Sequence, residues 1–264
     1  MKFKDIMIVS DLDGTLLNDQ KQVGISNQEH INEFVLNDGV FAIATGRTPL
    51  SAKPFLKNIK INGPCIFYNG SIVYDSKMEK ILAANKLDKV SIRPFIEMII
   101  KKNKVIVEVY SLDRIYIVSN KTYDNPIANN EGDKYQKANL DEIDSENWYK
   151  VLFCSYDGYL KEVDDLFKES GLSEKFNSFF SHDYYYEITP FETSKGSALE
   201  SLNISRFLCT IGDQANDLEM IKVADLGVAV KNANKLLIKE SDYLSVSNND
   251  ELIKDVLSYL TNLK

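Results

Sequence analysis

The sequence has few of the features that mark secreted or membrane-spanning proteins. Its 264 residues include only three cysteines, which lie far apart and form no Cys-x-x-Cys pair. A sparse, odd set of cysteines argues against a disulfide framework and favours a reducing compartment. No apolar run approaches the length that spans a membrane, and the N-terminal stretch MKFKDIMIVSD reaches an acid before any run that suits a signal peptide. We therefore predict a cytoplasmic protein without a membrane partner.

Positive charge is also scarce. Lysine and arginine number 31 against 39 acidic residues, so the formal net charge is −8 and the isoelectric point is near 5.0. Nucleic acids and anionic membranes attract basic surfaces, so we expect neither as a partner. An anionic substrate would need a local positive site. The apolar content, 44%, suits one large or two modest globular domains, and the sequence carries no signal for an oligomeric state.

Predicted strands and helices alternate in both terminal parts of the chain. An apolar strand at 6–10 precedes a helix that opens with a capping box at Ser26 and Glu29, and a second strand follows at 40–44. Near the C-terminus, a strand ending at Asp213 precedes a helix that starts after Gln214. This alternation predicts an α/β fold with a Rossmann-like, doubly wound parallel sheet.

The middle of the chain has a different pattern. We predict a hairpin that turns at Leu112–Asp113, a strand at 150–154, a helix at 159–170 and one strand-like segment at 176–186. No element can be assigned between 125 and 147. We therefore predict a core made of residues 1–82 and 184–264, interrupted by an inserted α+β domain at 83–183.

Acidic residues follow the predicted core strands. Asp11 and Asp13 end the first strand, and Asp213 and Asp217 lie at the end of a late one. The carboxyl ends of parallel strands meet at one edge of a sheet, where like charges repel and raise each other's pKa. A divalent cation and a lysine, Lys195, would offset them. Oxygen ligands with little nitrogen or sulfur favour Mg²⁺.

Four short motifs occur in a specific order: Asp11-Leu-Asp13-Gly-Thr-Leu, Thr45-Gly-Arg47, Lys195-Gly and Gly212-Asp-Gln-Ala-Asn-Asp217. In this order and rough spacing they resemble the haloacid dehalogenase-like superfamily, over essentially the whole chain. The long insert between the second and third motifs resembles the large α/β cap of its Cof-type phosphatases. The resemblance implies a Mg²⁺-dependent phosphatase of small phosphorylated metabolites, such as sugar phosphates or cofactor and nucleotide phosphates.

The resemblance also implies a role for each motif residue. Asp11 would attack phosphorus and form an aspartyl-phosphate, and Asp13 would protonate the leaving oxygen and then deprotonate the attacking water. Thr45 and Lys195 would hold the phosphoryl oxygens.

Metal and substrate positions follow from the same resemblance. Mg²⁺ would bind the Asp11 carboxylate, the Asp13 carbonyl and Asp213, with Asp217 in or just behind that shell. Four further positions would bind or orient the substrate: Gly46, Arg47, Asn69 and Asn216.

Other interpretations of these motifs remain open. A phosphomutase or phosphotransferase would use the same intermediate, and a non-enzymatic phospho-acceptor also pairs a strand-end aspartate with Mg²⁺. An EF-hand requires Gly and Glu where this chain has Leu16 and Gln22. Taken alone, Lys195 reads as a surface lysine, and the segment from Asp213 to Asp217 as a helix cap.

Overall fold

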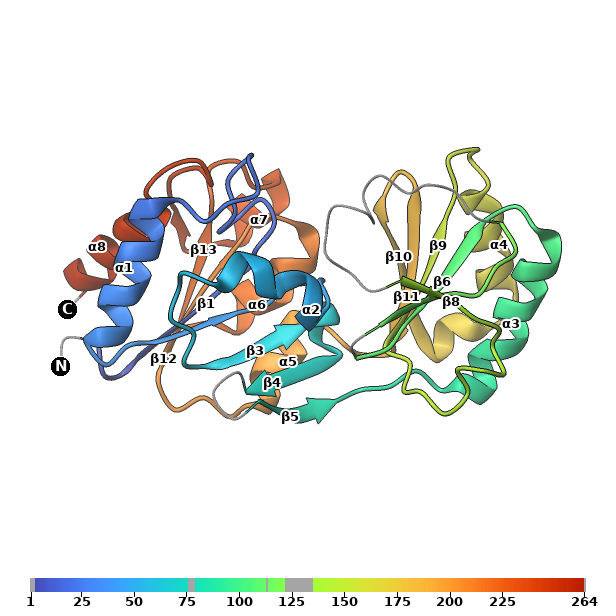
Figure 1. Ribbon diagram of the computed structural model, residues 1–264. Coiled ribbons are helices and arrows are strands. Elements are labelled where there is room, and N and C mark those ends of the chain that lie inside the picture. Colours follow the sequence, from blue (N-terminus) through green and yellow to red (C-terminus); the bar gives the residue numbers. More distant parts are fainter. Residues whose placement is uncertain (1–2, 76–78, 113, 122–134, 264) are drawn as a thin grey trace. The chain divides into compact units, whose positions relative to one another are not determined.

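The computed structural model describes residues 3–75, 79–112, 114–121 and 135–263, and the chain divides into two compact units (Figure 1). The first unit comprises Met1–Arg47, Ala52–Ala84 and Ser194–Lys264, and the second comprises Thr48–Ser51 and Asn85–Thr193. No described helix is both long enough and apolar enough to cross a membrane.

A five-stranded parallel sheet forms the centre of the first unit, with the strand order β14-β13-β12-β1-β2. Its strands are β1 (Ile6–Ser10), β2 (Val40–Ile43), β12 (Phe207–Gly212), β13 (Leu226–Ala229) and β14 (Tyr243–Leu244). Every residue of β1 is buried, as expected of a strand covered on both faces. The predicted parallel α/β sheet is confirmed, and it makes β1 and β12 neighbours although their paired residues, such as Ile6 and Phe207, lie 201 positions apart in the sequence.

Helices flank both faces of this sheet. They are α1 (Ile25–Leu36), α5 (Lys195–Ser201), α6 (Leu218–Val223), α7 (Lys235–Glu240) and α8 (Leu252–Asn262). The short helix α2 (Pro49–Ala52) lies mostly in the segment Thr48–Ser51, which belongs to the second unit. Figure 1 shows α1 beside α8 on one side of the sheet, with α5 and α6 on the other. This is the doubly wound arrangement that the alternating pattern predicts.

The predicted capping box of the first helix is wrong. Helix α1 begins at Ile25, and Gly24 occupies the N-cap position without any side-chain cap. The Ser26 hydroxyl instead donates a hydrogen bond of 2.6 Å to Glu251 Oε1. The Ser26 hydroxyl, which a local capping box would have used, is therefore bonded to Glu251, 225 positions away in the sequence.

A small antiparallel sheet completes the first unit: β3 (Pro64–Phe67), β4 (Ile72–Asp75) and β5 (Lys80–Ala84). The dipeptide Asn69–Gly70, a strong hairpin signal in the sequence, lies between β3 and β4, which pair antiparallel. Gly70 has a φ of 110°, and a side chain there would collide with the Ser194 carbonyl. The hairpin is therefore held close to the start of α5.

The second unit contains a six-stranded sheet with the order β10-β11-β9-β6-β7-β8, antiparallel except for the β7–β8 pair. Its elements are α3 (Lys89–Lys102), β6 (Ile106–Tyr110), β7 (Ile115–Ile117), β8 (Tyr135–Lys137), β9 (Lys150–Cys154), α4 (Leu160–Glu169), β10 (Phe176–His182) and β11 (Tyr185–Pro190). One face of the sheet packs against α3 and α4 through an apolar cluster that includes Val109, Val151 and Phe153. The unit has the α+β composition that its sequence suggests.

The segment predicted as one strand at 176–186 is in fact two. Strands β10 and β11 form an antiparallel pair, and β11 also pairs with β9. Because β11 belongs to the second sheet and ends at Pro190, the second unit continues to Thr193, beyond the boundary expected at 183. The predicted turn at Leu112–Asp113 is only partly described, because Asp113 lies outside the described residues. The strands on either side of it, β6 and β7, pair antiparallel as expected of a hairpin. Residues 122–134 also lie outside the described part of the chain.

We expect the packing of Phe153 to stabilise the second unit strongly. The Phe153 ring is fully buried and lies edge-on to Phe95 at 5.9 Å between ring centroids. Replacing Phe153 by Ala should reduce the free energy of unfolding by about 3–5 kcal/mol in urea titrations, through lost burial and the cavity left behind. Phe191→Ala, at a side chain 48% exposed, is the control and should cost less than about 1 kcal/mol. Equal losses for the two variants would contradict this assignment of the core.

Candidate active site

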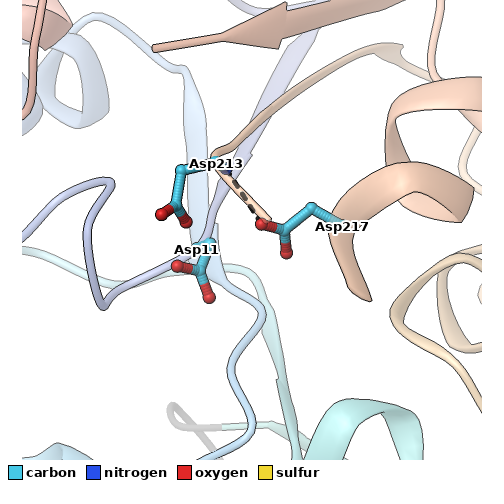
Figure 2. Close-up of side chains that lie close together, drawn as sticks. All are labelled: Asp11, Asp213 and Asp217. Carbon is cyan, nitrogen blue, oxygen red and sulfur yellow. Dashed lines mark hydrogen bonds between the residues drawn. The ribbon is translucent and has the colours of Figure 1, made fainter. Parts of the chain in front are cut away.

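Three buried carboxylates meet where strands β1 and β12 end. Asp11 follows β1, and its backbone N–H donates to the Ile211 carbonyl of β12 at 2.9 Å. Asp213 follows β12, and Asp217 lies in a short 3₁₀ turn just beyond it. One oxygen from each carboxylate lies within 4.8 Å of the others, and Figure 2 shows the three side chains converging. The parallel topology therefore brings together the acids that the sequence places on one sheet edge.

Lys195 lies in the first turn of α5 and is completely buried. Its ammonium group donates to Asp11 Oδ1 at 2.5 Å and to Asp217 Oδ1 at 2.6 Å. The interpretation of Lys195 as a surface residue is therefore wrong. With all groups ionised, the three carboxylates and one ammonium carry a net charge of −2, which matches a divalent cation.

The pKa values of these groups reflect their crowding. Burial, together with the charges of Asp217 and Asp213, raises the pKa of Asp11 well above its usual value, although Lys195 opposes this. Burial and the Asp217 charge raise the pKa of Asp213 to about 6. Burial would lower the pKa of Lys195, but its two carboxylate partners outweigh this and hold it above the usual range. A bound cation would favour the ionised acids.

Asp217 serves the loop as well as the lysine. Its Oδ2 accepts the backbone N–H groups of Asp213 at 2.9 Å and Gln214 at 3.0 Å, while Oδ1 binds Lys195. Asp217 therefore caps the turn after β12 while it also binds Lys195. Among the described residues it accepts three hydrogen bonds, whereas Asp213 accepts two, from Thr15 and Gln214, and Asp11 accepts one, from Lys195. A set of hard oxygen donors with net negative charge fits a divalent metal.

Asp13 has separate partners. Arg47 donates to both of its oxygens, from Nε at 2.6 Å and from Nη2 at 2.8 Å, and Lys21 Nζ approaches at 2.9 Å. Burial would raise the pKa of Asp13, but these hydrogen bonds and charges hold it below its usual value. The Arg47 guanidinium also lies over the Phe55 ring at 4.7 Å. The Asp13 carboxylate is thus held as an anion outside the acidic triad.

The remaining predicted residues continue this network. The Thr45 hydroxyl oxygen accepts the Arg47 backbone N–H at 3.2 Å, and the Thr45 carbonyl accepts the Asn69 N–H at 3.1 Å. The Asn216 side chain donates to Asn69 Oδ1 at 3.1 Å. A side chain at Gly46 would press against the Asn69 amide. All ten predicted site residues lie in the first unit, in one connected region.

The sequence alone did not reveal the residues that support this region. Thr15 donates to Asp213 Oδ1 at 3.0 Å, which its place in the first motif could have suggested. No pattern pointed to Asn232, which donates to the Gly14 carbonyl at 2.8 Å, or to Asn248, which donates to the Leu17 carbonyl at 3.1 Å. These two asparagines hold the segment after Asp13 from the other end of the chain.

A Rossmann-like sheet with three buried acids at its carboxyl edge could hold a metal ion there. The sequence profile of the haloacid dehalogenase-like hydrolases matches residues 8–257, so the chain belongs to this family. Members of the family generally use a metal, and the acidic triad offers a place for one. The chain is therefore a hydrolase of this family, and several of the relatives that it matches are named as phosphatases.

Its relatives and structural neighbours cover nearly the whole chain. It is 27% identical over 278 residues to the 5-amino-6-(5-phospho-D-ribitylamino)uracil phosphatase YwtE of Bacillus subtilis, covering 92% of this chain and 93% of that protein. It is 26% identical to the chloroplastic endoribonuclease YBEY of Arabidopsis thaliana, but spans only 45% of that protein's length. A solved haloacid dehalogenase-like hydrolase from Bacteroides thetaiotaomicron superposes with a TM-score of 0.87 at 26% identity, covering 96% of this chain and 98% of that one.

We expect Asp213 to destabilise the metal-free protein at neutral pH. Because its pKa is about 6 in the folded protein against 3.8 for the free side chain, ionisation costs folding energy. This cost is absent below pH about 4, grows as the pH rises through 6 and is complete above it. Asp213→Asn should therefore raise the free energy of unfolding of the metal-free protein by about 1–3 kcal/mol at pH 8, and by much less at pH 4.

Thermal unfolding with and without Mg²⁺ measures this effect. Mg²⁺ should raise the melting temperature of the wild type but not that of Asp213→Asn. Asp38→Asn, an exposed acid elsewhere on the first unit, is the control and should keep the Mg²⁺ response. A lower stability of Asp213→Asn than of the wild type at pH 8 without metal would count against this electrostatic description.

Proposed function

We propose that the protein is a Mg²⁺-dependent phosphatase that hydrolyses small phosphorylated metabolites through an aspartyl-phosphate on Asp11. The observation that carries the proposal is the state of this carboxylate. Lys195 holds Oδ1 of Asp11, whereas Oδ2 accepts no hydrogen bond from any residue that the structure describes. One oxygen is thus fixed while the other is available to attack phosphorus.

Positive charge and hydrogen-bond donors near Asp11 suit the transfer of a phosphoryl group, which needs positioning and charge neutralisation above all. The ammonium of Lys195 would bind a phosphoryl oxygen while holding Asp11. The Thr45 oxygen accepts a bond from Arg47 N–H, so its own proton is free to donate to another phosphoryl oxygen. Mg²⁺, held by Asp11, Asp213 and the Asp13 carbonyl, would neutralise charge on the phosphoryl group.

Asp13 would act as the acid and then as the base. Arg47 and Lys21 hold it as an anion, the form that deprotonates water in the second step. The first step needs the protonated form. A phosphate group competes well for a bidentate guanidinium, so we infer that substrate draws Arg47 away and lets the pKa of Asp13 rise.

The first unit would then be the catalytic core, and the second unit would select the leaving group. Sugar phosphates, cofactor phosphates and nucleotides all remain candidate substrates. The name of the Bacillus subtilis relative, a phosphatase of a phosphorylated ribitylamino compound, favours a substrate with a polyol chain. We also propose a cytoplasmic location, because the chain has only three cysteines and they lie far apart in the sequence.

Turnover of a generic aryl phosphate tests the reaction. With p-nitrophenyl phosphate and Mg²⁺, the wild type should release phosphate steadily, and a chelator should stop the release. A single stoichiometric burst would instead indicate a phospho-acceptor, and transfer to an added hexose phosphate would indicate a phosphomutase. Either result would overturn the hydrolase assignment.

Asp11→Asn tests the nucleophile. The amide keeps the size of the side chain but is a far weaker nucleophile, so kcat should fall by about 10⁴-fold or more. Asp5→Asn, at an exposed position just before β1, should retain wild-type kcat. Trapped phosphoenzyme, detected by mass spectrometry in the wild type and lost in Asp11→Asn, would identify the intermediate. Unchanged kcat in Asp11→Asn would remove Asp11 from this role.

A further inference from the structure

Three groups of the first unit constrain the carboxylate of Asp213, which is only 4% exposed. The Thr15 hydroxyl donates to Oδ1 at 3.0 Å, and the side-chain amide of Gln214 donates from Nε2 to Oδ2, also at 3.0 Å. The backbone of Gly14 packs against the same carboxylate, since a side chain there would collide with Oδ2. Each oxygen of Asp213 therefore has one neutral donor, and Gly14 limits rotation of the carboxylate on one side.

Gln214 differs from Thr15 in its exposure. Thr15 is completely buried, whereas Gln214 occupies an exposed position in the loop after β12. A long, exposed side chain loses rotamer entropy when one hydrogen bond holds it, so the bond to Asp213 must compensate for that loss. An ionised carboxylate only accepts hydrogen bonds, and a hydrogen bond to a charged acceptor is stronger than one between neutral groups. The Gln214 amide therefore presents its NH₂ group to Asp213.

The position of Asp213 gives this bond a consequence for cation binding. One oxygen of Asp213 lies within 4.8 Å of oxygens of Asp11 and Asp217, and Figure 2 shows its carboxylate directed towards Asp11. Hydrogen-bond partners of a metal-binding carboxylate fix its orientation before the ion arrives, and losing one typically weakens metal binding about 10- to 100-fold. Without the Gln214 bond, the ion would have to order Oδ2 of Asp213 as it binds.

We propose that Gln214 is a positioning residue, which orients the Asp213 carboxylate for a divalent cation. The proposal rests on the proposed function in that Mg²⁺ is taken as the cation. A purely structural role, in which the amide only stabilises the loop after β12, has a different consequence. Loss of a structural contact lowers the stability of the metal-free protein, whereas loss of a positioning contact raises the dissociation constant for Mg²⁺ and leaves the metal-free fold almost unchanged.

Gln214→Met tests the hydrogen bond, because methionine has a similar length but no donor. In calorimetric titrations of the full-length protein with MgCl₂, the dissociation constant should rise about tenfold. The melting temperature of the metal-free variant should stay within about 3 °C of the wild type, since the position is exposed. Gln214→Ala also lacks the donor and should show the same loss of affinity. Gln20→Met, at an exposed position of the first unit, is the control and should bind Mg²⁺ as the wild type does.

Turnover of p-nitrophenyl phosphate separates positioning from catalysis. Gln214→Met should need about ten times more Mg²⁺ than the wild type for half-maximal activity. At saturating Mg²⁺ its kcat should stay within about twofold of the wild type, because Asp213 itself is still present. A kcat that stays low at every Mg²⁺ concentration would overturn the positioning role.

The two binding variants also distinguish the donor from the bulk of the side chain. An unchanged Mg²⁺ dissociation constant in Gln214→Met would overturn the proposal, even if Gln214→Ala binds more weakly, because packing and not the hydrogen bond would then be responsible. If the wild type binds Mg²⁺ but hydrolyses no phosphate ester, the proposed function fails, while the calorimetric comparison still decides the role of Gln214. A wild type that binds no Mg²⁺ would overturn both.

Discussion

The buried ammonium of Lys195 is the interaction on which the active region depends. It lies between Asp11 and Asp217 with no exposed surface. These two ion pairs join the start of α5 to the end of β1 and to the turn after β12. Three carboxylates within 4.8 Å of one another would repel strongly without it. Removing one partner of a buried ion pair leaves an uncompensated charge and costs about 3–5 kcal/mol. The same contact that makes the arrangement tolerable also orients the carboxylate proposed to react.

The excess negative charge that remains at this site lowers the stability of the metal-free protein and favours the binding of a cation. Asp213 and Asp11 both have raised pKa values because burial and neighbouring carboxylates disfavour their ionised forms. A bound metal ion would offset that electrostatic cost, because it would stabilise the charges that the folded chain has brought together. Asp217 limits the cost by accepting two backbone N–H groups as well as the lysine.

The second unit shows how strand alternation can give one sheet two different faces. Residues such as Val109 and Val151 pack against α3 and α4, while Tyr110 and Lys150, one position away on the same strands, lie on the opposite face of the sheet. Both faces consist of buried side chains. Burial alone therefore does not distinguish the apolar core from a face that carries ionisable side chains.

Much of the fold and of the candidate site follows from local patterns. Three kinds of element were predictable because each depends on neighbouring residues: the apolar strands, the Asn69–Gly70 turn and helix α4. The alternation of strands with helices then implies a parallel sheet. The capping-box prediction failed because a distant residue binds the side chain that the local pattern assigned to the cap. Ser26 bonds to Glu251 and does not cap α1. The segment 176–186, which the sequence pattern indicated as strand-like, turns back on itself as the paired strands β10 and β11.

The sequence by itself determined which chemical groups are present and that the acids lie at strand ends, because motif spacing and strand periodicity are local properties of the chain. Only the tertiary structure decided that Lys195 is buried between two carboxylates, that Arg47 and Lys21 hold Asp13, and that Asn248 supports the segment after it. These contacts join residues from 8 to 231 positions apart. Their formation depends on the order of strands in the sheet and on loop closure, which no local pattern encodes.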